Sequence, residues 1–131
     1  MKGYLIKPAE QSITEIGLLD CSDTEDNSRR LLQQLYEHLL IDKGSRLVQQ
    51  MHLRFCVRPQ HLPMPDVMLV DEEGLIRVTT QALGWFCFGH QSFAGRGIVL
   101  GETQDGWWTS PKLTIEQLRP FVRYSPPRHN S

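Results

Sequence analysis

A chain of 131 residues is expected to form one domain with a core that needs no disulfide bonds. Its 14 Lys and Arg residues nearly balance its 15 Asp and Glu residues, so no strong net field favours nucleic acid or a membrane surface as a partner. No apolar run approaches the ~20 residues that a membrane span requires. Composition therefore argues against a membrane protein and against a nucleic-acid-binding protein.

Cysteine usage favours a cytoplasmic location. The three cysteines, Cys21, Cys56 and Cys87, cannot all pair within one chain, which is typical of proteins from a reducing compartment. At the N-terminus, Pro8 and Glu10 come too early for the apolar core of a signal peptide.

Charge is unevenly distributed along the chain. Ala9 to Asp26 contains acidic residues and no basic ones, and Lys43 to Arg58 contains basic residues and no acidic ones. Two interpretations stay open. The segments are either solvated surfaces that offset each other or the poles of a molecule whose acidic edge docks a basic partner.

The first predicted element is a β-hairpin. Gly3 to Lys7 is rich in β-forming residues and ends at Pro8, and Ser12 to Leu19 forms a second, imperfectly alternating run. After an acidic connector, the clearest element is a long amphipathic helix from Glu25 to Asp42, which is expected to pack on a sheet. Its apolar stripe consists of Leu31, Leu32, Leu35, Tyr36, Leu39 and Leu40.

The middle of the chain is ambiguous. Leu47, Met51 and Phe55 have helical spacing, whereas the alternation up to Val57 favours a strand over roughly Gln50 to Val57. Three prolines then predict an extended loop: Pro59, Pro63 and Pro65. The structure of residues 45–65 is not determined by these patterns.

Several strands follow. Asp71 to Gly74 predicts a tight turn between two strands, Gly84 to Gly89 brackets a buried strand, and Gln104 to Gly106 predicts a hairpin turn. Such turns cannot connect parallel strands, so the sheet is expected to be largely antiparallel.

The C-terminal part predicts one more helix. Thr114 and Gln117 have the spacing of a capping box for a short helix from Ile115 to Arg119. Pro120 ends this helix, and a last strand follows it. The predicted fold is a single α+β domain over residues 1–124, in which a largely antiparallel, strongly curved sheet packs on the long helix. Residues 125–131 have the composition of a disordered tail.

Gly95, Gly97 and Gly101 have a spacing that can cradle a phosphate. A dinucleotide site also needs a helix that begins near the last glycine, and β-rich residues occupy that place here. The glycines are therefore predicted to serve the sheet, and no nucleotide or other cofactor is expected.

The second half of the chain resembles small uncharacterised accessory proteins of phages, plasmids and integrated mobile elements. The matching motifs are a D-x-x-G-L turn, here Asp71, Gly74 and Leu75, and a G-x-G-x-x-x-G-x-x-x-D-G run, here Gly95, Gly97, Gly101, Asp105 and Gly106. The resemblance covers about half of the chain and its N-terminal strand. It implies an accessory product of a mobile genetic element and supplies no catalytic residues.

No residue pattern assembles a metal or catalytic motif. A zinc site would need His52, Cys56, Cys87 and His90 together, but a strand separates the first two by roughly 13 Å. The chain is therefore expected to bind no metal. Two alternatives stay open: a small enzyme or ligand-binding protein with a pocket near Cys87, His90 and Ser92, and an aromatic and basic face for nucleic acid. The second is disfavoured by the balanced charge.

The preferred function is partner binding without catalysis. Adjacent strand residues point to opposite faces, so one of Trp107 and Trp108 is predicted to enter the core and the other to point outward. An outward indole is a typical interface anchor. The predicted partner-binding residues are Trp107, Trp108, Asp20 and Asp23, and the partner is another protein or a second copy of the chain.

Overall fold

The computed structural model describes residues 1–21, 24–42, 47–52 and 66–125, with only the backbone described at 47–52. At its centre lie three strands, β1 (Lys2–Lys7), β4 (Val67–Asp71) and β7 (Gly97–Glu102), in which most consecutive residues are buried. Such strands need cover on both faces, because their side chains alternate between the two sides of the sheet.

The three strands belong to a six-stranded sheet with the order β2-β1-β7-β4-β3, and the sixth strand pairs with β7. The added strands are β2 (Ser12–Gly17), β3 (Leu47–His52) and β8 (Trp108–Thr109). The second sheet has the order β6-β5-β9, with β5 (Trp85–Phe88), β6 (Gln91–Ala94) and β9 (Val122–Ser125). All pairings between these strands are antiparallel.

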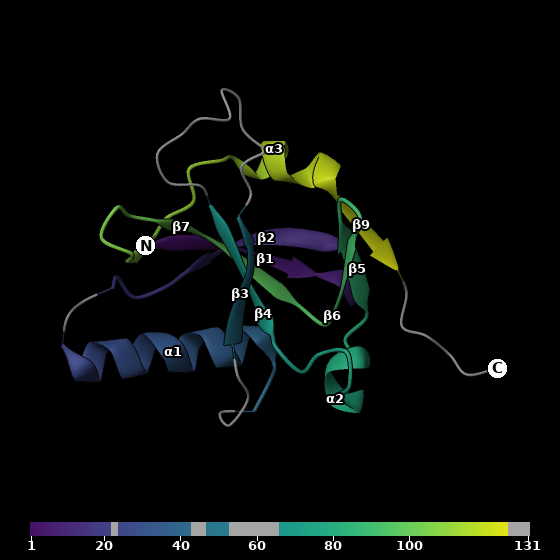
Figure 1. Cartoon of the computed structure of the whole chain (residues 1–131), viewed down its shortest axis with the longest axis horizontal. Coiled ribbons are helices and arrows are strands. Elements are labelled where there is room, and N and C mark those ends of the chain that lie inside the picture. Colours follow the sequence, from purple (N-terminus) through teal and green to yellow (C-terminus); the bar gives the residue numbers. More distant parts are fainter. Residues whose placement is uncertain (22–23, 43–46, 53–65, 126–131) are drawn as a thin grey trace.

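Four short helical segments and one longer helix complete the described fold. They are η1 (Pro8–Glu10), α1 (Glu25–Leu39), α2 (Val78–Gln81), α3 (Ile115–Leu118) and η3 (Arg119–Phe121). In Figure 1, α1 lies below the larger sheet, α3 lies above it, and the smaller sheet stands beside β1 and β7 at the side opposite the N-terminus.

Two apolar clusters form the core. On one face of the larger sheet, buried leucines of α1 pack against a row that includes Leu5, Leu69 and Ile98. On the other face, Tyr4 and Val99 pack with residues of the smaller sheet, of α3 and of the segment before α3, among them Phe86, Phe88, Phe93, Leu113 and Leu118. The central strands are therefore covered by a helix on one side and by the smaller sheet and α3 on the other.

The structure confirms an α+β fold with antiparallel sheets, but not one continuous curved sheet. The strands divide into two sheets, because Phe86 and Phe88 of β5 turn their rings onto the larger sheet and form a separate layer with β6 and β9. Strand β6 was not predicted, since Gln91 and Ser92 are polar and exposed.

The α1 helix is shorter than predicted. It has 15 residues and ends at Leu39 rather than Asp42, because Leu40 adopts a left-handed conformation with a φ of 56° and its N–H bonds back to the helix. Leu31, Leu35 and Leu39 are its buried residues, one turn apart.

The predicted hairpin at Asp71 to Gly74 is wrong. The Asp71 carboxylate is buried and accepts hydrogen bonds from the Glu73 N–H at 3.1 Å and the Thr80 hydroxyl at 2.8 Å. These bonds turn the chain away from the sheet and into α2, where a second strand was expected.

Other local predictions are confirmed. The opening hairpin pairs β1 with β2 across η1, and the turn at Gln104 to Gly106 joins β7 to β8. The α3 helix begins with a complete capping box: the Gln117 N–H donates to Thr114 Oγ1, and the Thr114 N–H donates to Gln117 Oε1. The predicted strand from Gln50 to Val57 corresponds in part to β3, and residues 53–57 lie outside the described range, as do the proline loop and residues 126–131 of the tail.

Candidate partner-binding surface

A groove at the N-terminal end of the molecule brings together three of the four predicted partner-binding residues, Asp20, Trp107 and Trp108. It consists of two adjoining open hollows of about 350 Å³ and 400 Å³. Other lining residues are Met1, Cys21, Ser28, Thr103, Asp105, Gly106 and Thr109. We call this feature the tryptophan groove. The fourth predicted residue, Asp23, lies outside the described residues.

The β7–β8 hairpin positions the two indoles. The Trp107 N–H donates to Thr103 Oγ1 at 3.0 Å, and the Thr103 N–H donates to the Trp107 carbonyl at 2.8 Å. Gly106, with a φ of 83°, closes the turn in a conformation that suits glycine. Trp107 lies just before β8 rather than in it, and two hydrogen bonds with Thr103, one to the hydroxyl and one between backbone groups, hold its backbone in place.

The structure decides which indole points outward. Trp107 is exposed, at 37%. Trp108 pairs with Glu102 in the sheet and packs against the core cluster on the α1 side. Trp107 is therefore the more exposed of the two indoles, Trp108 is partly buried, and both line the same groove.

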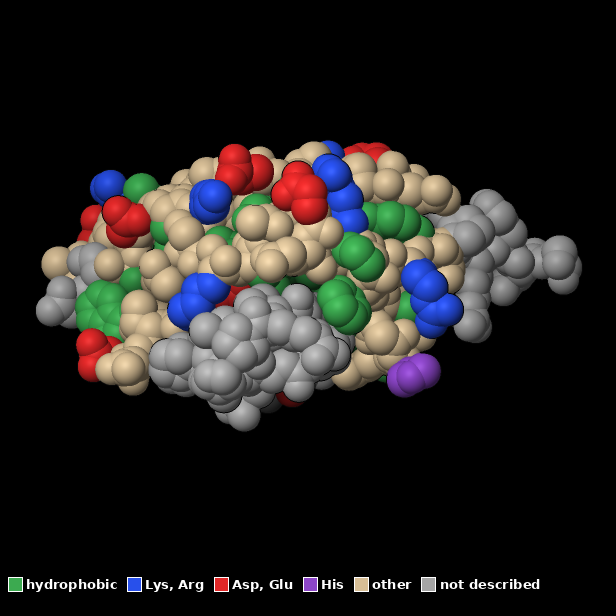
Figure 2. Space-filling view, turned by 90° about the horizontal axis from the view of Figure 1, so that it is seen from above, with side chains coloured by type: hydrophobic (Ala, Val, Ile, Leu, Met, Phe, Trp, Pro, Cys, Tyr) green, Lys and Arg blue, Asp and Glu red, His purple; other side chains and the backbone are tan. Residues whose placement is uncertain are grey.

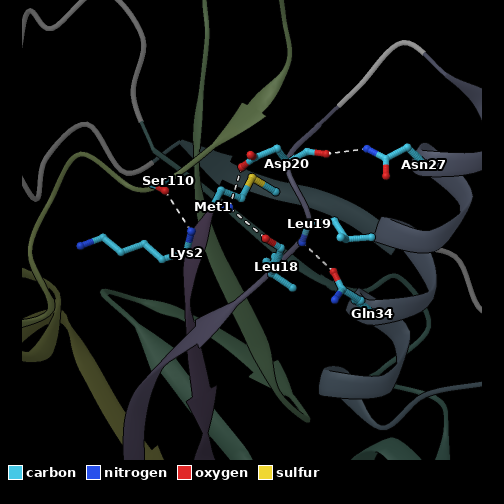
Figure 3. Close-up of polar contacts among 8 residues, drawn as sticks. All are labelled: Met1, Lys2, Leu18, Leu19, Asp20, Asn27, Gln34 and Ser110. Atoms are coloured by element: carbon cyan, nitrogen blue, oxygen red, sulfur yellow. Dashed lines mark hydrogen bonds and ion pairs between the residues drawn. The ribbon is translucent and has the colours of Figure 1, made fainter.

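Asp20 enters the groove from the connector between β2 and α1. Its Oδ1 accepts a hydrogen bond from the α-ammonium group of Met1 at 2.6 Å, and the same ammonium donates to the Leu18 carbonyl at 2.9 Å (Figure 3). The Asp20 carbonyl accepts from Asn27 Nδ2 at 3.0 Å, so α1 is also tied to this connector. The Asp20 side chain nevertheless remains 85% exposed, and such an exposed ion pair is worth about 0–1 kcal/mol.

The sequence reading missed Asp105, a second carboxylate of the groove. It lies at the tip of the β7–β8 hairpin, two residues before Trp107, and is exposed. The sequence contains a pattern that indicates this placement: an Asp-Gly turn directly before two tryptophans places a carboxylate close to the first indole. On the face shown in Figure 2, acidic, apolar and basic side chains lie next to each other at the left end, the end that carries the N-terminus in Figure 1.

A second exposed apolar surface lies at α2. Leu75, Ile76 and Val78 are 60%, 77% and 79% exposed. These residues were predicted to form a strand because they are rich in β-forming residues, and an apolar strand is usually buried. Here the buried bonds of Asp71 direct the run outward instead.

The structure brings together two of the three residues of the alternative pocket. Cys87 and Ser92 face each other across β5 and β6, with Sγ and Oγ 3.3 Å apart. His90 is exposed in the turn between these strands, and no hydrogen bond joins it to either side chain among the described residues. A nearby hollow of about 80 Å³ is lined by Ser92 but not by Cys87 or His90.

The glycines with phosphate-loop spacing lie in and beside β7. A Cβ atom on Gly97 would come within 2.9 Å of Phe86 Cζ, and one on Gly101 would collide with the Ser110 carbonyl oxygen. Gly95 has a φ of 83° and packs against Thr80. These positions therefore require glycine for close packing and backbone conformation. The strand continues through Gly97 and Gly101, so no helix begins there to hold a phosphate.

Buried Asp66 anchors the segment between β8 and α3. Its carboxylate accepts from the Lys112 N–H at 3.0 and 2.9 Å and from the Leu113 N–H at 2.9 Å. The Tyr4 hydroxyl donates to the Leu113 carbonyl at 2.9 Å. Burial raises the pKa of Asp66 and of Tyr4 above their ordinary values. Through their hydrogen bonds, Asp66 and Tyr4 attach the segment before α3 to the larger sheet.

Metal ligands do not gather in the described part of the chain: no three His, Cys, Asp or Glu side chains there could hold one ion. Cys56 and the side chain of His52, whose separation was predicted from the sequence, lie outside that part. No helix among the described residues has the length and apolarity needed to cross a bilayer.

Comparison with protein-family models, curated proteins and solved structures finds no match for this chain.

Proposed function

We propose that the protein acts by binding another protein at the tryptophan groove, without catalysis, as an accessory factor of a mobile genetic element. The observation that carries this proposal is the placement of Trp107. Its indole is held outside the core by the hairpin turn and lines an open groove together with Trp108 and Asp20.

The hydrogen bonds of the turn support an anchoring role. A side chain whose backbone is already fixed loses less conformational freedom on binding than one on a mobile loop. Tryptophan is also enriched among the residues that dominate binding energy at protein interfaces. Trp107 combines both properties, because backbone and hydroxyl bonds from Thr103 fix its position.

The alternative, an enzyme or ligand-binding protein with a pocket near Cys87, His90 and Ser92, is less well supported. Small-molecule sites usually enclose about 300–1,000 Å³. The hollow beside Ser92 has about 80 Å³, and its lining does not include the thiol or the imidazole.

The test compares partner capture by three forms of the full chain. Wild type, Trp107→Ala and the control Gln104→Ala are immobilised and exposed to lysate of the source cells, and retained proteins are identified by mass spectrometry. Gln104 is exposed on the same hairpin but does not line the groove.

We expect wild type and Gln104→Ala to retain the same stoichiometric protein and Trp107→Ala to lose it. Sedimentation of the three forms tests whether this protein is a second copy of the chain. Equal capture by all three forms, together with equal association states, would refute binding at this groove.

A further inference from the structure

We infer that the tryptophan groove receives a lysine or arginine side chain of the partner. The inference rests on the proposed function and adds the chemistry of the group that is recognised. Three observations carry it: the exposed indole, the carboxylates beside it, and the absence of Lys and Arg side chains from the described part of the lining.

The indoles supply the first part of a cation site. Tryptophan has the ring that attracts cations most strongly, and the attraction acts within about 6 Å of the ring centre. Trp107 and Trp108 both line the groove, and Trp107 is the one with substantial exposed surface. A guanidinium or ammonium group could therefore lie against indole surface while its alkyl stem covers apolar lining.

The carboxylates supply the second part. Asp20 and Asp105 line the same hollow, from two segments far apart in the sequence. The Met1 ammonium group neutralises Asp20 in part, through Oδ1. Asp105 forms no ion pair with any described residue, so its charge remains available to a cation from outside.

The surroundings favour a cation over other occupants. Among the described residues that line the groove there is no Lys or Arg side chain. On neighbouring α1, Arg29 and Arg30 form ion pairs with Glu25 and Asp26, one turn earlier in the same helix. An anion would be repelled by Asp105, and a purely apolar anchor would take the Asp105 carboxylate out of water without a partner, which costs free energy.

The test uses peptide probes of matched shape. The first is acetyl-Gly-Ser-Arg-Ser-Gly-amide, and the second carries citrulline, which is a neutral isostere, in place of arginine. Each is titrated into the isotopically labelled full chain, and the indole N–H signals are followed by NMR. Wild type, Asp105→Asn and the control Asp42→Asn are compared. Asp42 is exposed beyond the opposite end of α1 and lies outside the groove.

With the arginine peptide we expect saturable shifts of the Trp107 indole signal in the wild type. The citrulline peptide should bind the wild type at least about tenfold more weakly. The arginine peptide should bind Asp105→Asn at least about threefold more weakly than it binds Asp42→Asn. Equal affinity for the two peptides, or no shift of the Trp107 signal, would overturn the inference.

The capture experiment separates this inference from the proposed function. If the captured partner is lost with Trp107→Ala but retained equally by Asp105→Asn and at high salt, partner binding stands and the cation site is refuted. If no capture depends on Trp107 but the arginine peptide still binds selectively, the cation site stands and the proposed partner-binding function fails.

Discussion

Replacing Asp66 by alanine should lower stability substantially, although the residue lies outside any predicted motif. Asp66 is 3% exposed, and its carboxylate accepts hydrogen bonds from the N–H groups of Lys112 and Leu113. Alanine would leave both donors without this acceptor, at roughly 1–3 kcal/mol for the buried Leu113 N–H and less for the partly buried Lys112 N–H. Removing a buried charge offsets part of this loss. The expected decrease in the free energy of unfolding is therefore about 2–4 kcal/mol.

The measurement is urea unfolding followed by tryptophan fluorescence at pH 7. Asp105→Ala is the matched control, since this exposed carboxylate should change the free energy of unfolding by no more than about 0.5 kcal/mol. An Asp66→Ala protein as stable as this control would refute the assigned anchoring of the segment before α3.

The pH dependence gives a second check on Asp66. Burial raises the pKa of its carboxyl group in the folded state above the ordinary 3.8, so the folded protein holds this proton more tightly than the unfolded chain. The contribution of this proton to stability is complete below the ordinary pKa and is lost as the pH rises through the folded value. The stability difference between wild type and Asp66→Ala should widen from pH 7 to pH 4. A narrowing difference would contradict the stated direction of the shift.

Three further substitutions test the packing by urea unfolding. Gly101→Ala should destabilise the protein by at least about 1–3 kcal/mol because its Cβ collides with the Ser110 carbonyl, whereas Gly17→Ala, with no atom near its Cβ, should not; equal effects would contradict the close approach. Leu35→Ala should cost about 2–5 kcal/mol and exposed Leu32→Ala less than about 1 kcal/mol; the reverse order would place the wrong face of α1 in the core. Tyr4→Phe should cost about 1 kcal/mol through the lost bond to Leu113, and an unchanged free energy of unfolding would show that this bond contributes nothing.

The elements predicted correctly are those that neighbouring residues specify. Thr114 and Gln117 are three positions apart and cap α3 with each other, and the turn around Gly106 joins two strands adjacent in sequence. The apolar spacing of the leucines likewise located the body of α1, although not its end at Leu39. In each case the residues that specify the element lie only a few positions apart in the sequence, so the sequence alone predicts it.

Other features depend on contacts between distant segments, which a local pattern does not contain. Val67 to Val70 and Leu75 to Val78 are both β-rich, yet the first run is buried between two layers and the second follows the Asp71 turn into solvent.

The tryptophan groove has the same origin. Asp20 and Trp107 are far apart in the chain and meet there because β1 pairs with both β2 and β7, which places the connector after β2 near the hairpin after β7. The sequence by itself determined which segments are apolar and where the chain turns. Only the tertiary structure decided which apolar side chains are covered and which charged ones share a surface, because burial depends on what packs against a segment and not on the segment alone.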